Sequence, residues 1–320
     1  ESKDMDRPIT KVAGMETILR VRDFPIFNRS VRHEDDPSLY VLARETRRIS
    51  ESQAAILNTF EDLDGPLLSV MRTTRCPKIY TLGPIHEHLK ARIKLQGKHH
   101  GSYISQVSPS GMWKMDKSCI AWLDDQPLHS VVYVSFGSTT TMTKGQLMEF
   151  WYGLVNSKQR FLWVRRPNSC KDGELGEIPE ELIEGTKERG KVVEWAPQEE
   201  VLAHKAIGGF LTHCGWNSTM ESIATGVPMI CWPYFADQLI ISRFVGEVWK
   251  LGLDMKDMCD RVVVEEMIKC LMVEKRDEFF MSATRMAELA RASVSEGGSS
   301  YSNLDHLVEE IRLLANSASG

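Results

Sequence analysis

The stretch GGFLTHCGWNSTMESIATGVPMICWPYFADQ, residues 208–238, decides the fold of this chain. Its apolar start, 208–212, predicts a short buried strand, and 217–225 predicts a helix. The next apolar run, 227–232, predicts a second strand, and a further helix is expected over 237–245. Short apolar strands that alternate with helices indicate an α/β fold with a parallel, doubly wound sheet.

The same alternation continues on both sides of this stretch. The sequence predicts further strands over 131–136, 161–164 and 191–194, and helices over 143–156, 198–204, 264–273, 276–294 and 303–314. Sheets of this kind bind ligands at the carboxyl ends of their strands. Polar residues that follow a predicted strand are therefore the candidates for a binding site.

The residues that follow the strand 208–212 suit an anion. They read His213-Cys214-Gly215-Trp216-Asn217-Ser218, and a helix is predicted to begin among them. A helix N-terminus presents unpaired N–H groups and a partial positive charge. Gly215 lets the backbone approach a ligand, while Asn217 and Ser218 are residues of the capping type. A plain helix cap has a similar sequence, so both interpretations stand at this point.

Composition excludes several classes of function. The chain has 320 residues and a formal net charge of −5, with no basic stripe of the kind that binds nucleic acid. No run of about 18 apolar residues predicts a membrane span. The seven cysteines are scattered without C-x-x-C spacing, which indicates reduced thiols in a cytoplasmic protein and no metal site.

The N-terminal part looks incomplete. Strands are predicted over 53–58 and 78–82, with a helix over 61–71 between them. Two strands are too few for a buried parallel sheet. Because residue 1 is Glu, we expect the native start to lie upstream. Residues 96–120 are polar and rich in Gly and Ser, which predicts a linker.

Residues 195–238 resemble, nearly end to end, the signature box of plant secondary-product UDP-glycosyltransferases. The resemblance extends to Trp122-Leu123-Asp124, to VYVSFGS at 132–138, and to SVSEGGSSYSNLDHLVEEI at 293–311. It implies the GT-B fold, in which two Rossmann-like domains face each other, with the N-terminal domain incomplete here. The implied organisation is an acceptor-domain remnant at 1–95, a linker at 96–120, a UDP-sugar-binding domain at 121–300, and a returning C-terminal helix at 301–320.

The resemblance also implies roles for individual residues. Trp195 would stack on uracil, where a core aromatic is the plainer interpretation, and the backbone of Ala196 would bond the uracil edge. Gln198 and Glu221 would hold the ribose. The remaining implied contacts are Ser138, His213, Asn217 and Ser218 to the diphosphate, Asp237 and Gln238 to the sugar, and Cys214, Gly215, Trp216 and Phe235 along the pocket. Asp237 is also a plausible N-cap.

The expected activity is inverting, metal-independent transfer of glucose from UDP-glucose to a hydroxyl or carboxyl of a small hydrophobic plant aglycone. UDP-glucose acts as co-substrate, no cofactor is expected, and a cytoplasmic monomer is implied. The family's catalytic His and its Asp partner belong to the region upstream, so no catalytic residue is assigned in this chain. A naturally truncated, non-catalytic UDP-sugar-binding protein is the alternative. An epimerase would need a G-x-G-x-x-G after a strand, and none occurs.

Overall fold

The computed structural model describes residues 2–24, 37–76, 78–95, 115–173, 176–256 and 258–317. Its chain divides into two compact units. The larger unit comprises Arg22–Pro25 and Pro109–Arg285, and the smaller unit comprises Glu1–Val21, Ile26–Ser108 and Met286–Gly320. Most of the predicted linker, residues 96–114, lies outside the described residues.

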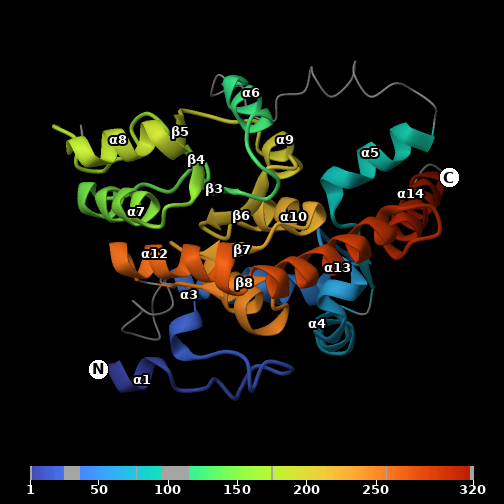
Figure 1. The fold of residues 1–320 in the computed structure, drawn as a ribbon. Coiled ribbons are helices and arrows are strands. Elements are labelled where there is room, and N and C mark those ends of the chain that lie inside the picture. The colour runs from blue at the N-terminus through green and yellow to red at the C-terminus, as the bar shows by residue number, and fades with distance from the viewer. Residues whose placement is uncertain are drawn as a thin grey trace. The chain divides into compact units, whose positions relative to one another are not determined.

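A six-stranded parallel sheet forms the centre of the larger unit, in the order β5-β4-β3-β6-β7-β8 (Figure 1). Its strands are β3 (Val131–Ser135), β4 (Arg160–Val164), β5 (Gly190–Val193), β6 (Ile207–Thr212), β7 (Met229–Cys231) and β8 (Gly252–Asp254). This is the order of a Rossmann sheet, which reverses between its first strand, β3, and its fourth, β6. The predicted α/β doubly wound fold is confirmed.

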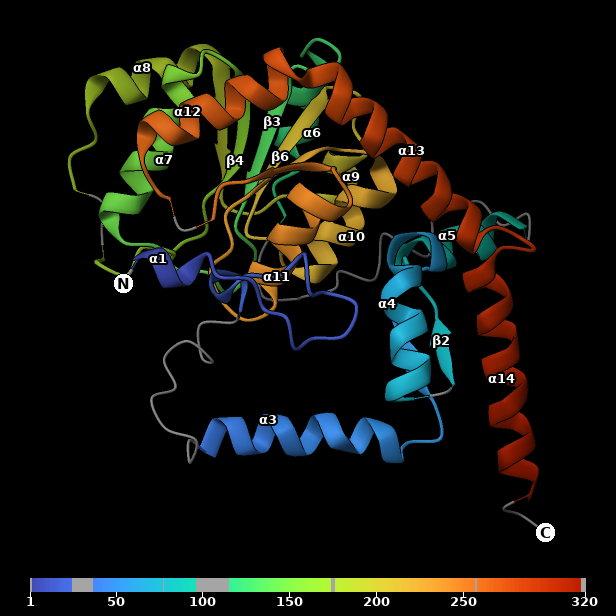
Figure 2. The ribbon, with the colours of Figure 1, turned by 90° about the horizontal axis from the view of Figure 1, so that it is seen from below.

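Helices cover both faces of this sheet. Helices α7, α8 and α12 gather on one side, and α9 and α10 on the other (Figure 2). The helices of this unit are α6 (Ser118–Asp124), α7 (Lys144–Asn156), α8 (Glu180–Arg189), α9 (Gln198–Leu202), α10 (Trp216–Thr225), α11 (Gln238–Arg243), α12 (Arg261–Lys269) and the start of α13 (Arg276–Val294). Parallel strands covered on both faces are apolar throughout, and all five residues of β3 are buried.

Two π-helical segments extend helices of the larger unit. Phe244–Val248 continues α11, and Cys270–Glu274 continues α12. At the N-terminus of α7, Thr143 forms a capping box with Gln146, so the helix predicted over 143–156 has its N-cap at the first of these residues. Helix α6 begins at Ser118, so the prediction that the linker continues to residue 120 is wrong at its end. Its apolar residues Cys119 and Leu123 are buried, and this burial stabilises a helix despite the polar sequence before it.

The smaller unit contains a two-stranded parallel sheet of β1 (Ala55–Leu57) and β2 (Ile79–Thr81). Asn303 of α14 donates to the Thr81 carbonyl at 3.1 Å, and Ser300 donates to the Gly83 carbonyl at 2.7 Å. These bonds group α14 with β2, so residues from Met286 onward fall in this unit, not from 301 as predicted. Its helices are α1 (Ser2–Met5), α3 (Pro37–Arg48), α4 (Glu61–Thr74), α5 (Ile85–Leu95) and α14 (Ser299–Ser317), with a 3-10 turn at Ile49–Glu51. A second 3-10 turn, Val21–Asp23, begins in this unit and continues into the larger one.

None of the helices in the described part of the chain has the length and apolar character needed to cross a membrane. Helices α13 and α14 have 19 residues each, but charged side chains recur along both of them.

Candidate functional site

The carboxyl ends of β3 and β6 lie side by side where the strand order reverses, the place where such sheets bind ligands. The chain turns after β3 at Gly137, whose φ is +72°. It leaves β6 through His213, which is buried. A Cβ atom on Gly137 or on Gly215 would lie 2.4 or 2.5 Å from Nε2 of His213. The two loops therefore close around the imidazole, and both positions need glycine.

His213 is neutral at physiological pH. Burial, and after it the charge of Arg166, lower the pKa of His213 to about 4. Its Nδ1 atom is buried and has no hydrogen-bond partner among the described residues. A neutral imidazole offers one donor and one acceptor nitrogen. His213 is thus suited to bind a phosphate oxygen through a hydrogen bond and not through a charge.

This low pKa predicts a pH dependence of stability. The folded state binds the His213 proton less readily than the unfolded state. The contribution of neutral His213 to the free energy of unfolding is therefore fully present above about pH 6.5 and is lost as the pH falls toward 4. At pH 4.5 the loss should reach about 2–3 kcal/mol. The free energy of unfolding is measured at pH 7 and at pH 4.5 for the unmutated chain and for His213→Gln. Between these two pH values it should decrease by about 2–3 kcal/mol less in His213→Gln than in the unmutated chain. An equal fall in both proteins would contradict it.

Cys214 packs beneath the loop. It is fully buried, its φ is +63°, and its N–H donates to Oγ1 of Thr212 at 3.2 Å. Burial raises the pKa of the Cys214 thiol well above its usual range, so a thiolate does not form near neutral pH. His213 and Cys214 therefore do not form a nucleophile–base pair, and Cys214 acts as a small apolar residue.

Helix α10 begins at Trp216, directly after this loop. Gly215 occupies the N-cap position, where no side chain makes a capping hydrogen bond. Asn217 and Ser218, which are residues of the capping type, both lie inside its first turn. Asn217 is exposed and Ser218 is buried. A helix start without a side-chain cap retains its capacity for an anion, which supports the predicted anion site.

Gln198, Ser218 and Glu221 come together beside this helix start. Nε2 of Gln198 donates to Oγ of Ser218 at 2.8 Å and to Oε2 of Glu221 at 2.7 Å. The Tyr133 hydroxyl donates to Oε1 of Gln198 at 3.2 Å. Three elements, β3, α9 and α10, thus orient a carboxylate whose remaining lone pairs can accept hydroxyl donors such as those of a ribose.

Trp195, Ala196 and Ser138 lie in loops at strand ends. Trp195 follows β5 and is half-buried, and its carbonyl accepts from the Asp116 N–H at 2.9 Å. Its fixed backbone and partly exposed side chain suit a stacking platform. Ala196 is buried beside it, and Ser138 is exposed after β3.

Phe235, Asp237 and Gln238 follow β7. Phe235 and Asp237 are exposed, while Gln238 is buried. Asp237 stands at the N-cap position of α11, but its side chain makes no capping bond. Oε1 of Gln238 instead accepts from the N–H groups of Tyr234 and Phe235, at 2.8 and 3.0 Å. Asp237 therefore keeps its carboxylate outside the helix cap.

Sequence reasoning missed Tyr133 and Arg166. Tyr133 lies inside an apolar strand, and only its hydroxyl distinguishes it from a core aromatic. Arg166 follows β4, and its guanidinium donates to the Thr140 carbonyl in the loop after β3. Two arginines, Arg165 and Arg166, follow the predicted strand 161–164, and this position after a strand was the available signal. Among the described residues, no group of three or more His, Cys, Asp or Glu side chains is arranged to hold a metal ion.

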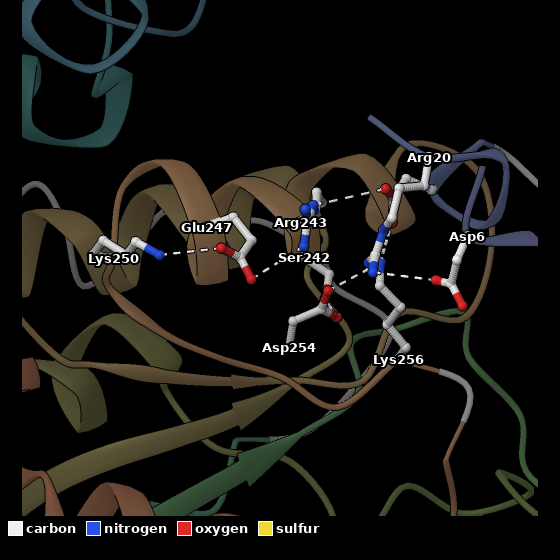
Figure 3. Close-up of polar contacts among 9 residues, drawn as sticks. Asp6, Arg20, Ser242, Arg243, Glu247, Lys250, Asp254 and Lys256 are labelled. Atoms are coloured by element: carbon white, nitrogen blue, oxygen red, sulfur yellow. Dashed lines mark hydrogen bonds and ion pairs between the residues drawn. The ribbon is translucent and has the colours of Figure 1, made fainter. Parts of the chain in front are cut away.

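A cluster of buried charges lies at the carboxyl end of β8. Lys256 forms ion pairs with Asp254, at 3.0 Å, and with the fully buried Asp23. The Ser242 hydroxyl of α11 donates to Asp254 (Figure 3). Arg243 of the same helix lies 3.8 Å from Asp23. The cluster joins the segment Arg22–Pro25 to β8 and α11 within the larger unit.

Comparisons with known proteins agree with this geometry. Residues 110–286 match the family described as "UDP-glucoronosyl and UDP-glucosyl transferase". The chain is 58% identical, over 312 residues, to 7-deoxyloganetic acid glucosyltransferase of Catharanthus roseus, covering 97% of this chain and 63% of that protein. It is 46% identical to myricetin 3-O-rhamnoside 1,2-glucosyltransferase of Crocosmia x crocosmiiflora, covering 98% of this chain and 63% of that protein. The chain thus spans a little under two thirds of these relatives.

Solved structures give the same result for the fold. The structure of Os79 from O. sativa in complex with UDP has a TM-score of 0.75 and 32% identity, and the match covers 91% of this chain and 63% of that one. UGT2 of Phytolacca americana, complexed with UDP-2fluoro-glucose and pterostilbene, also has a TM-score of 0.75, with 30% identity and coverage of 91% and 61%. Family match, identity and fold agree: the chain belongs to the plant UDP-glycosyltransferases, which have the GT-B fold.

Proposed function

We propose that this chain is the donor-binding part of an enzyme that transfers glucose from UDP-glucose to a hydroxyl or carboxyl of a small plant aglycone. One observation carries the proposal. At the point where the strand order reverses, neutral His213, the start of α10 without a side-chain cap, and the oriented Gln198–Glu221 pair lie on adjoining elements. This set of groups suits a ribose and a diphosphate.

The proposed contacts follow the donor from base to sugar. Trp195 and the Ala196 backbone bind uracil, and Gln198 and Glu221 bind the ribose hydroxyls. The other proposed contacts are Ser138, His213, Asn217 and Ser218 to the diphosphate, Asp237 and Gln238 to glucose, and Cys214, Gly215, Trp216 and Phe235 along the pocket.

The proposed reaction is an in-line displacement that inverts the anomeric carbon. The acceptor oxygen forms a bond to that carbon as the bond to the UDP oxygen breaks, and the acceptor proton passes to a base. Negative charge gathers on the departing diphosphate, where the N–H groups of α10 and His213 stabilise it from fixed positions. These groups supply that stabilisation without requiring a metal ion.

The relatives favour transfer over non-catalytic binding, since those described above are named as glucosyltransferases. Donor binding is supported by the rice structure, which holds UDP. The Phytolacca structure holds a UDP-sugar analogue together with a small aromatic molecule, pterostilbene. All seven cysteines of this chain are free thiols, which supports placing the protein in the cytoplasm. We propose that it acts as a monomer.

Replacing Trp195 tests the nucleotide end of the site. Because base–aromatic stacking contributes about 1–3 kcal/mol, Trp195→Ala should weaken UDP binding by about 5- to 150-fold in titration calorimetry. Trp122→Ala is the matched control, since Trp122 is a half-buried tryptophan of the same unit to which no ligand role is assigned. Equal UDP affinities of Trp195→Ala and the unmutated chain would remove Trp195 from the site.

A further inference from the structure

Arg166 stands at the same edge of the sheet as the proposed diphosphate site. It follows β4, which pairs with β3, and β3 pairs in turn with β6. Its Nη2 atom donates to the carbonyl oxygen of Thr140. Thr140 and Ser138 belong to the same loop after β3. Arg166 is half-buried, and its guanidinium remains charged, as arginine does in proteins.

Two buried polar atoms of the adjoining loops have no hydrogen-bond partner in the described part of the chain. They are Oγ1 of Thr140, a residue with only 1% of its surface exposed, and Nδ1 of His213. Buried polar atoms are normally hydrogen-bonded. Their presence beside Arg166 indicates a place that is built for a polar ligand and not for apolar packing.

We propose that Arg166 is a positioning residue for the diphosphate of the donor, acting through the Thr140 carbonyl on the loop that presents Ser138. This inference rests on the proposed function, because it assumes that a UDP-sugar binds where the strand order reverses. Arg166 holds that loop through a charged donor, and hydrogen bonds from charged donors are about twice as strong as neutral ones.

The charge of Arg166 has a second effect at this edge. His213 is neutral, so it offers the diphosphate no positive charge. The guanidinium is near enough to His213 to lower the pKa of that ring, and it attracts the phosphates over a similar range. Lys171, in the loop after β4 that also contains Arg166, is exposed. Its ammonium group donates to the Tyr234 hydroxyl and lies over the Tyr234 ring. Its charge is therefore more strongly screened.

Arg165 provides a matched control. It carries the same charge one residue earlier, but its guanidinium lies 5.7 Å from the ring centroid of Trp151. Trp151 belongs to α7, on one face of the sheet, and not to the loops that enclose His213. Arg165→Gln therefore removes a positive charge from the same loop without removing the bond to Thr140.

The experiment compares UDP with uridine, which lacks phosphates, by titration calorimetry at one pH and one salt concentration. Arg166→Gln should weaken UDP binding about tenfold or more and leave uridine binding unchanged, while Arg165→Gln should change neither. Unchanged UDP affinity in Arg166→Gln, or an equal loss for UDP and uridine, overturns the proposal. If the glutamine variant does not fold, Arg166→Lys decides by the same criterion, with an expected loss of about two- to fivefold for UDP alone.

A second measurement does not depend on the ligand. NMR titration of His213 in the ligand-free chain should give a higher pKa in Arg166→Gln than in the unmutated chain or in Arg165→Gln. No rise would mean that the guanidinium does not face the site, and would overturn the proposal. The calorimetry also distinguishes a failure of the proposed function from a failure of the role of Arg166. An unmutated chain that binds UDP no better than uridine contradicts the proposed function as well, whereas discrimination that survives Arg166→Gln contradicts the role of Arg166 alone.

Discussion

Replacing Lys256 with Met should destabilise the larger unit by about 3–5 kcal/mol, the cost of removing one partner from a buried ion pair. The substitution leaves the Asp23 carboxylate in place, and none of its surface is exposed. Arg243 also lies near Asp23, at 3.8 Å, but it pairs with Glu247 at 3.1 Å. Asp23 would therefore lose the buried ammonium group that contacts it directly.

Two further variants distinguish this buried pair from an ordinary surface pair. Asp23→Asn should cost less than Lys256→Met, because Lys256 keeps Asp254 at 3.0 Å. Lys250→Met removes a lysine whose side chain is 61% exposed and pairs with Glu247, so it should change stability by no more than about 0.5 kcal/mol.

Urea denaturation followed by tryptophan fluorescence measures these effects. All eight tryptophans lie between residues 109 and 285, so their emission reports on the larger unit. A loss below about 1 kcal/mol in Lys256→Met, or a loss equal to that of Lys250→Met, would show that the cluster at β8 is not a buried ion pair in solution.

We expect the 320-residue chain to bind UDP and to form no glucoside at an enzymatic rate. The resemblance places the family's general base in a region that this chain does not match, and the chain spans 63% of its relatives. A positioned general base is worth about 10²–10⁴ in rate. Holding the acceptor against the donor can contribute up to about 7–11 kcal/mol more.

The assay supplies UDP-glucose with a panel of small phenolic and terpenoid acceptors and detects glucosides by mass spectrometry. The full-length Catharanthus roseus relative, given 7-deoxyloganetic acid, serves as the positive control. Turnover by the 320-residue chain at about 1 s⁻¹ or faster would mean that a base exists among its residues and has been overlooked.

Short apolar segments allowed most of the sheet to be predicted from sequence. Strands such as β3 and β6 consist of buried residues bounded by polar turns, so their pattern is local. Strand β8 was missed because Leu253 is the one large apolar residue among Gly252–Asp254, so no apolar run marks this strand. Helix α14 was predicted from residue 303 because the preceding Gly-Gly-Ser-Ser suggested a loop. In the structure α14 begins at Ser299. Ser300, in its first turn, donates to the carbonyl of Gly83, which lies more than 200 residues earlier in the chain.

In the candidate site, too, local features could be predicted from the sequence and contacts between distant segments could not. His213 to Ser218 are contiguous, so their position between a strand and a helix could be predicted, together with the anion site that follows from it. Arg166 and Tyr133 reach this edge from other strands, and no local spacing connects them to it. Asp23 lies 233 residues before Lys256, so only the folded chain brings the two charges together. The side-chain bonds of Gln198 and Gln238 likewise depend on rotamers that a sequence does not specify.

A crystal structure of this chain with UDP tests the central claim most directly, namely that the nucleotide binds where the strand order reverses. We expect the uracil ring against Trp195, the ribose hydroxyls at Glu221, and the diphosphate beside His213 and the start of α10. UDP bound at another edge of the sheet, or with its diphosphate away from His213 and α10, would contradict it.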